Sequence, residues 1–280
     1  MKKITTLLGL LSFAGAAFAH DGNFPLDTLT SPSLSNFKVS ASVGFESEYV
    51  FRAVKLAGYS VQPKVEIAYP VAGFDLYGGA WMNAPVQSQR NSSGELSNLQ
   101  EIDFYAGATY AYQMLTFDVG YTYYWYPSDK ADISRENEVY FGITGDSASF
   151  LGGVNLNPSV YYFYNFQLEQ HVIESSLGYE FEVGSYVGVN GLTLPLRAYF
   201  GWLSADRANG DQDYSAGSAD SDASYFYYGG SADIAYAFNE YCTVSAGVRY
   251  SQHFNRHGDA RSMDSGERRL WYGVKVDFGF

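Results

Sequence analysis

The chain ends with the stretch Arg269-Leu-Trp-Tyr-Gly-Val-Lys-Val-Asp-Phe-Gly-Phe280, in which two kinds of side chain alternate. Every second residue from Leu270 to Phe280 is apolar, and the residues between them are mostly small or charged. Successive side chains of a β-strand point to opposite faces, so strict alternation indicates a strand with one apolar and one wetter face. We therefore predict that the polypeptide finishes on a two-faced strand with an aromatic last residue.

The N-terminus has the pattern of a secretory signal peptide. Lys2 and Lys3 precede an apolar run that closes on Ala17-Phe18-Ala19, which is a typical cleavage site. The run is shorter than the ~20 residues that a membrane-spanning helix needs, so a membrane anchor is the weaker interpretation. We expect residues 1–19 to be the signal peptide. Residues 20–36 are polar with two prolines, and we expect them to form a short periplasmic lead-in.

The alternation begins at residue 37 and divides the remaining chain into twelve segments of strand length. These segments are 37–52, 60–70, 74–83, 101–112, 115–126, 136–144, 155–164, 172–182, 192–203, 224–238, 242–251 and 269–280. Most connections alternate between long polar segments and short turns, as in outer-membrane barrels. We predict an all-β, transmembrane, up-and-down antiparallel β-barrel over residues 37–280. Pro63, Pro158 and Pro195 fall inside segments, so we expect bulges or shifted ends there, and ten or fourteen strands are the alternatives.

The composition agrees with a barrel better than with a soluble domain. Aromatic residues make up 18% of the chain, with 26 Tyr and 20 Phe. The mean hydropathy of −0.18 would suggest a soluble protein, but barrel strands carry apolar residues only at every second position. Outward aromatic residues concentrate at strand ends, as with Tyr49, Phe51 and Trp125 at the outer rim and Tyr112 and Phe278 at the periplasmic rim. Two aromatic girdles of this kind mark the interfaces of a membrane.

The charge balance and the cysteine content exclude several functions. The net charge is −13, and it becomes more negative once the signal-peptide lysines are removed, which argues against a nucleic-acid partner. The single cysteine, Cys242, excludes an internal disulfide. The acidic loop from Asp206 to Asp213 lacks the spacing of an EF-hand, and we predict no metal site and no cofactor.

The positions that face the predicted interior collect charged residues, and acids outnumber bases among them. We expect the lumen to be lined by Lys38, Glu46, Glu48, Arg52, Lys64, Glu66, Trp81, Glu101, Asp103, Asp118, Glu138, Glu174, Arg197, Asp233, Arg249 and Lys275. About 8 strands give a filled interior and 16–18 an open channel, so twelve lie between. We favour a narrow, acidic passage for ions or small hydrophilic solutes. The alternative is a structural or surface-interaction barrel whose salt-bridged interior plugs the lumen.

A barrel hydrolase is the third hypothesis, and the histidines argue against it. His20 lies in the lead-in, His171 starts a strand, and His253 and His257 fall in the last outer loop by the predicted strand ends. None has the His-x-Ser arrangement of barrel hydrolases, and serine hydrolysis also needs a group that orients the histidine. We therefore predict no catalytic residues and no enzyme activity.

Several motifs resemble one known family. The stretch from Val39 to Arg52 resembles the "GFxSxYVFRG" opening strand of the TorF-like family of small predicted outer-membrane porins, and residues 101–107, 118–127 and 137–140 resemble its middle strands. Ala53 stands where that family usually has Gly. The resemblance implies a barrel in the outer membrane of a Gram-negative bacterium. Expected partners are outer-membrane lipid and lipopolysaccharide, small solutes or cations, and the barrel assembly machinery through the strand that ends in Phe280.

Overall fold

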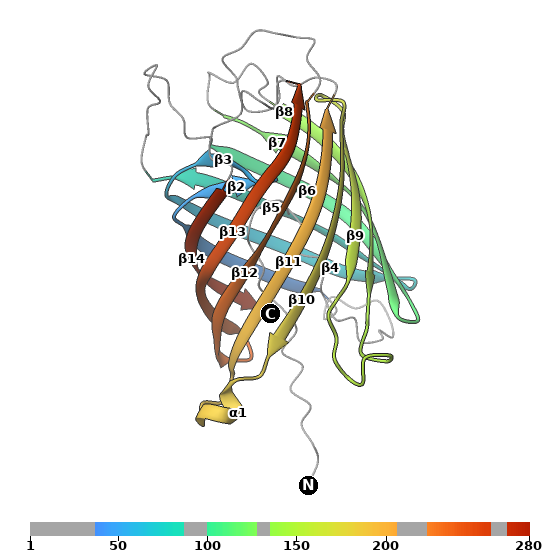
Figure 1. The fold of residues 1–280 in the computed structure, drawn as a ribbon. Coiled ribbons are helices and arrows are strands. Elements are labelled where there is room, and N and C mark those ends of the chain that lie inside the picture. Colours follow the sequence, from blue (N-terminus) through green and yellow to red (C-terminus); the bar gives the residue numbers. More distant parts are fainter. Residues whose placement is uncertain (1–36, 87–99, 128–134, 206–222, 259–267) are drawn as a thin grey trace.

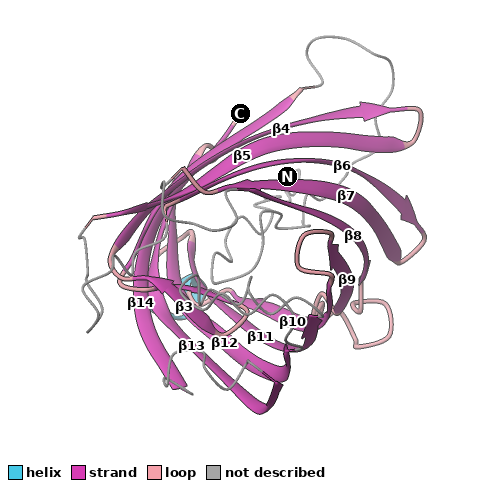
Figure 2. Cartoon of the chain, turned by 90° about the horizontal axis from the view of Figure 1, so that it is seen from above, coloured by secondary structure: helices cyan, strands magenta, loops and turns pink. Residues whose placement is uncertain are grey.

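A computed structural model describes residues 37–86, 100–127, 135–205, 223–258 and 268–280. Twelve strands form a closed barrel, and two short strands, β2 (Tyr49–Phe51) and β3 (Val54–Ala57), form a separate two-stranded sheet (Figures 1 and 2). The wall strands are β1 (Lys38–Glu46), β4 (Ser60–Val71), β5 (Phe74–Pro85), β6 (Glu101–Tyr112), β7 (Leu115–Trp125), β8 (Arg135–Gly145), β9 (Ser159–Asn165), β10 (Gln170–Phe181), β11 (Leu192–Ala205), β12 (Ala223–Asn239), β13 (Cys242–Gly258) and β14 (Arg268–Gly279).

The barrel closes where the first wall strand meets the last. β1 pairs antiparallel with β14 from Ser40 opposite Gly279 to Glu46 opposite Gly273, and it pairs with β4 on its other side. Every other wall strand pairs with its neighbour in the chain. A closed sheet leaves no edge strand, so the backbone groups of the wall are bonded within the sheet. The predicted fold class and the count of twelve wall strands are confirmed.

The two ends of the barrel differ in their connections. At one end, called the turn end, short links such as 72–73 and 240–241 join the strands, and the one-turn helix α1 (Gly184–Val187) lies there, at the bottom of Figure 1. At the other end, called the loop end, lie the connections from β1 to β4 and from β9 to β10. No helix in the described part of the chain is long and apolar enough to cross a membrane.

The two faces of the wall have opposite exposure, as the alternation predicts. On the outer face, apolar side chains such as Val119, Val160 and Ile234 are more than half exposed. On the inner face, side chains such as Tyr227 and Glu138 are almost fully buried. The polar side chains are therefore enclosed and the apolar ones displayed, which is the reverse of a soluble protein.

The predicted first strand is too long, and this is the main correction to the sequence analysis. β1 ends at Glu46, and residues 48–58 leave the wall and fold into the barrel as the hairpin of β2 and β3, which we call the lumen hairpin. Tyr49 is buried inside and Phe51 is half-buried, so neither belongs to the outer aromatic rim. The segment expected to be an outer loop, 53–59, supplies β3 instead.

Other strand ends and the prolines also differ from prediction. β9 starts at Ser159 rather than residue 155, which leaves Pro158 outside the strand. Pro63 and Pro195 stay inside β4 and β11, and the register of each strand is the same on both sides of the proline. Pro63 has a partner on β1 but none on β5, and Pro195 has one on β10 but none on β12. A proline cannot donate to a ladder, so a local gap on one side, rather than a bulge, accommodates it.

Inward tyrosines pack on glycines of the adjacent strand. A Cβ added to Gly107 would lie 2.1 Å from the Tyr77 hydroxyl, and one on Gly142 would lie 2.1 Å from the Tyr161 ring. Each ring therefore extends sideways along the wall, over the residue directly opposite, instead of across the lumen. The pairs are Gly79 with Tyr105, Gly107 with Tyr77, Gly120 with Tyr140, Gly142 with Tyr161, Gly201 with Tyr227 and Gly229 with Tyr199.

We predict that Gly142→Ala destabilises the folded barrel by about 1–3 kcal/mol, because the new methyl group must displace the Tyr161 ring. Gly178→Ala is the matched control, since its methyl group would meet only the Leu196 carbonyl at 3.6 Å. Urea unfolding of both variants in lipid vesicles, followed by tryptophan fluorescence, measures the difference. Equal stability of the two variants would contradict the packing described.

Candidate functional site: the barrel interior

The hydroxyl groups of the inward aromatic rings donate to buried carboxylates. Tyr77 and Tyr161 both bond to Asp118, at 2.7 and 3.1 Å. A buried carboxylate is costly unless hydrogen bonds or charges compensate it, and a tyrosine hydroxyl supplies such a bond. The other pairs are Tyr105 with Glu66 at 2.8 Å, Tyr227 with Glu174 at 2.8 Å, Tyr124 with Glu138 at 2.9 Å and Tyr49 with Glu101 at 2.9 Å.

Ion pairs add a second kind of compensation. Arg249 lies between two carboxylates, 2.7 Å from Asp233 and 3.3 Å from Glu46, and all three side chains are almost fully buried. The further interior pairs are Arg52 with Glu138, Lys64 with Glu66, Arg197 with Glu174, and Lys275 with Asp277. The interior is thus a connected network of tyrosines, carboxylates and basic groups.

Acids outnumber bases among the buried side chains that the structure describes. The buried acids are Glu46, Glu66, Glu101, Asp103, Asp118, Glu136, Glu138, Glu174, Asp233 and Asp277, and the buried Lys and Arg residues are Arg52, Arg249 and Lys275. Asp103 Oδ1 is buried without a hydrogen-bond partner. Acidic side chains are therefore in excess over lysine and arginine in the enclosed space of the described barrel.

The lumen hairpin spans the interior at the loop end and contacts most of the wall. Tyr49 packs against Trp81 of β5 with ring centroids 5.4 Å apart, and Phe51 packs against Tyr124 of β7 at 6.3 Å. The backbone carbonyl of Arg52 accepts a bond from Tyr225 of β12 at 3.1 Å. These strands lie on different sides of the ring in Figure 2, so the hairpin contacts the wall across the width of the lumen.

The turn of the lumen hairpin is strained. Phe51 pairs with Val54, so Arg52 and Ala53 form a two-residue turn, and their φ angles are +47° and +66°. Such turns normally take Asn-Gly, because left-handed backbone costs other residues about 1–3 kcal/mol each. The surroundings hold the turn in place, since Tyr225 bonds the Arg52 carbonyl and His253 Nδ1 is placed to donate to the Ala53 carbonyl at 3.2 Å.

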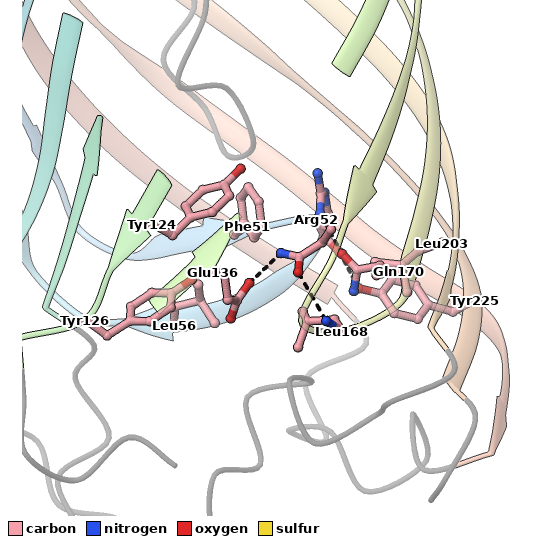
Figure 3. A pocket seen from close by; sticks show the side chains of 11 residues that line it. Phe51, Arg52, Leu56, Tyr124, Tyr126, Glu136, Leu168, Gln170, Leu203 and Tyr225 are labelled. Atoms are coloured by element: carbon pink, nitrogen blue, oxygen red, sulfur yellow. Dashed lines mark hydrogen bonds between the residues drawn. The ribbon is translucent and has the colours of Figure 1, made fainter. Parts of the chain in front are cut away.

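The Arg52 guanidinium occupies a compact site on the inner wall (Figure 3). It donates to both carboxylate oxygens of Glu138, at 2.8 and 3.0 Å, and to Gln170 Oε1 at 2.6 Å. Its Cζ lies 4.6 Å from the centre of the Phe51 ring and 5.2 Å from that of Phe163. Burial alone would lower the pKa of Arg52, but the adjacent Glu138 carboxylate outweighs burial and raises it, so the group stays charged.

A small cavity adjoins this guanidinium. Its volume of about 10 Å³ holds roughly one water molecule. On one side it is bounded by Phe51, Arg52 and Leu56 of the hairpin. On the other side lie Tyr124, Tyr126, Glu136, Asn165, Leu168, Gln170, Leu203 and Tyr225. The hairpin and the wall therefore meet at an interface that is polar and incompletely filled.

The structure places the predicted lumen residues on the inner side, in two groups. Glu46, Arg52, Glu66, Glu101, Asp103, Asp118, Glu138, Glu174, Asp233, Arg249 and Lys275 are buried in the network. Lys38, Glu48, Lys64, Trp81 and Arg197 are partly exposed. Glu48 lies in the bend before β2, where it pairs with Lys55 at 2.9 Å, and Arg52 belongs to the hairpin rather than to the wall. Whether these residues line a path for solutes stays a prediction.

Several residues of the site were not predicted from the sequence. Glu136 has the same parity as Glu138 and could have been found from it, whereas Gln170 lies outside the predicted strands. The expectation that His253 lies in an outer loop is wrong, because β13 continues to Gly258 and buries this side chain beneath the hairpin. The side chain of His171 is partly exposed, and its Nδ1 lies 2.8 Å from the Tyr162 hydroxyl oxygen.

Some predictions concern residues outside the described ranges. These are the signal peptide and lead-in at 1–36, with His20, and the acidic loop at 206–213. Among the described residues, no three His, Cys, Asp or Glu side chains are grouped as a metal site requires.

We predict that Arg249→Met destabilises the barrel by about 3–5 kcal/mol, because it leaves two buried carboxylates without their cation. Adding Glu46→Gln and Asp233→Asn should restore most of the loss. Lys55→Ala is the control, since it removes a partly exposed pair of the same charge type and should cost no more than about 1 kcal/mol. Unfolding midpoints in detergent micelles test this order, and a harmless Arg249→Met would show that water reaches the carboxylates.

The chain matches one protein family and resembles several solved barrel structures. Residues 30–264 match the model of a family described as "Bacterial protein of unknown function (Gcw_chp)". No curated protein matches the sequence. Among solved structures, the COG4313 outer membrane channel from Pseudomonas putida F1 aligns with a TM-score of 0.50 at 8% identity, covering 91% of this chain and 100% of that one.

Two further solved structures align over a similar length. The KdgM porin gives a TM-score of 0.44 at 9% identity, covering 87% of this chain and 99% of that one. LpxR from Salmonella typhimurium gives 0.49 at 10% identity, covering 86% and 99%. At such identities a likeness concerns the fold alone, and the interior must be interpreted from its own residues.

Proposed function

This chain belongs to the Gcw_chp family, whose description assigns no function, and we propose that it is a narrow outer-membrane channel of the porin type. In this proposal small cations or other small hydrophilic solutes pass through its acidic lumen, and the lumen hairpin closes the passage at the loop end. The resemblance of the opening strand to the TorF-like porins supports the same function. The signal peptide, the outer-membrane location, and the lipid, lipopolysaccharide and assembly-machinery partners belong to the proposal too.

The observation that carries the proposal is the direction of the inward tyrosine rings. Because these six tyrosine rings extend along the wall over glycines, they do not reach straight across the lumen. Among the described residues, one hairpin spans the lumen at the loop end, and its two ends and its side-chain contacts join it to the wall. A scaffold filled for stability alone would not need to keep its largest side chains off the axis.

The charge of the interior supports cations as the permeant class. Buried carboxylates outnumber buried lysines and arginines in the described residues, and rings of carboxylates favour cations in channels. We propose no hydrolase activity, because His253 is enclosed by the hairpin instead of being displayed in an outer loop.

A structural barrel with a plugged lumen is the second candidate. The buried Arg52 ion pair and the two side-chain hydrogen bonds to the turn carbonyls favour it, because they hold the hairpin in the closed position. The two candidates differ in what removal of the hairpin does, since a channel would then open and a filled scaffold would lose its interior packing.

We predict that the purified protein in a planar bilayer gives small conductance steps, with a reversal potential that favours potassium over chloride. Replacing residues 48–58 by a short Gly-Ser turn should raise the single-channel conductance several-fold, because it removes the element that spans the lumen. Shortening the turn-end connection 146–158, whose Phe150 is well exposed, is the matched control and should leave the conductance unchanged. Absence of steps in both the native and the hairpin-less protein would favour the plugged scaffold.

We predict that Val119→Arg, at the middle of β7 on the outer face, destabilises the protein in lipid vesicles by about 2–4 kcal/mol. Leu115→Arg, on the same face at the start of the strand, should cost only about 0–1 kcal/mol because it reaches the membrane interface. Denaturant unfolding in vesicles compares the two. Equal and small effects would mean that this face does not contact lipid.

A further inference from the structure

We propose that the site filled by Arg52 is a binding site for solutes that carry a guanidinium group, with the arginine of the lumen hairpin acting as a built-in occupant. This inference rests on the proposed function and deepens it, because it names the class of cation that the acidic lumen would recognise. In the structure as described, a passing guanidinium would have to displace that of Arg52.

The wall side of the site has the chemistry that selects a planar cation with several donors. Glu138 accepts from Arg52 with both of its oxygens, and Gln170 Oε1 accepts from the other terminal nitrogen. Phe163 of β9 presents its ring 5.2 Å from the guanidinium carbon. A compact ammonium ion uses such a fork and ring less well than a guanidinium does.

The same wall continues beyond the guanidinium into space that is not filled. The adjoining cavity is bounded by Glu136, which accepts a bond from Asn165 at 2.6 Å, and by the rings of Tyr124 and Tyr126. Asp103 Oδ1 is buried without a hydrogen-bond partner, and the Asp103 carboxyl interacts first with that of Glu101 and then with those of Glu138 and Glu136, so it adjoins the same acidic group. The wall around the site therefore offers an acceptor, Glu136, besides the three oxygens that Arg52 contacts.

On the hairpin side of the site, the backbone of Arg52 has an unfavourable conformation. Arg52 itself has a left-handed φ of +47°, and Ala53 follows at +66°. Strain of this kind favours release of the turn once another cation satisfies Glu138 and Gln170. The two hydrogen bonds to the turn carbonyls and the packing of Tyr49 and Phe51 on the wall then oppose release. The site and the closure of the lumen are thus coupled through one side chain.

Arg52→Ala with methylguanidinium as the probe tests the site directly. Isothermal titration in detergent micelles should show methylguanidinium binding to Arg52→Ala at least tenfold more tightly than to the native protein, in which the site is occupied. Arg52→Ala combined with Glu138→Gln should abolish the binding. Tetramethylammonium, which has the charge but no N–H donors, should not bind, and Lys55→Ala, which alters a neighbouring hairpin cation, should behave like the native protein.

Folding of the variant supplies a second measurement. If Arg52→Ala fails to fold, methylguanidinium added during refolding should restore the folded fraction seen by heat modifiability, and it should not rescue the variant that also carries Glu138→Gln. Neither binding nor rescue, or binding that survives Glu138→Gln, would overturn the inference. These measurements need no ion flow, so a guanidinium site without any conductance would count against the channel and leave the site standing.

Discussion

Closure of the sheet on itself is the constraint from which the rest of the molecule follows. Once β1 pairs with both β4 and β14, the wall has no free edge, and each wall residue faces either outward or into an enclosed space. The apolar outer face can then meet hydrocarbon without exposing backbone groups. The inner face carries charged and phenolic groups that water reaches only in part, so these groups need hydrogen-bond and charge partners within the barrel.

These partners come from a local arrangement of side chains that repeats around the inner wall. A glycine on one strand makes room for a tyrosine ring from the next, and the ring's hydroxyl donates to a carboxylate, as with Gly107, Tyr77 and Asp118. Basic side chains complete the network where two or more carboxylates come close, as Arg249 does between Glu46 and Asp233. Such an arrangement keeps these rings along the wall, so the lumen hairpin is the main described element that crosses the enclosed space.

The alternation predicted the wall well, because a period of two is what an enclosed sheet imposes on its residues. The segment 101–112 matches β6 in full, and the inward carboxylates from Glu66 to Asp233 are buried where parity places them. The lumen hairpin was not predicted, since Ser47, Tyr49 and Phe51 continue the period of β1. One signal was present, because Val50 and Phe51 are consecutive apolar residues, which indicates burial on both faces.

The site around Arg52 could not be predicted from the sequence, for a related reason. Its parts come from the hairpin, β8, β9 and β10, and no local pattern tells which wall residues a hairpin will touch. The end of β13 shows the same limit, since the polar run after Ser251 resembles a loop although it continues the strand and buries His253. Periodicity specifies the direction of a side chain and says little about its partners across a barrel.

The lumen hairpin lies between β1 and β4 in the chain, so its contacts with the wall depend on closure of the barrel. Its contacts run from Trp81 on β5 to His253 on β13, so an unfinished, open sheet has no enclosed chamber to receive it. Arg52 follows the first wall strand in the chain, yet it bonds Glu138 on β8 and Gln170 on β10. The hairpin therefore ties the segment after the first strand to strands around the whole ring, and its full set of native contacts exists only in the correctly closed barrel.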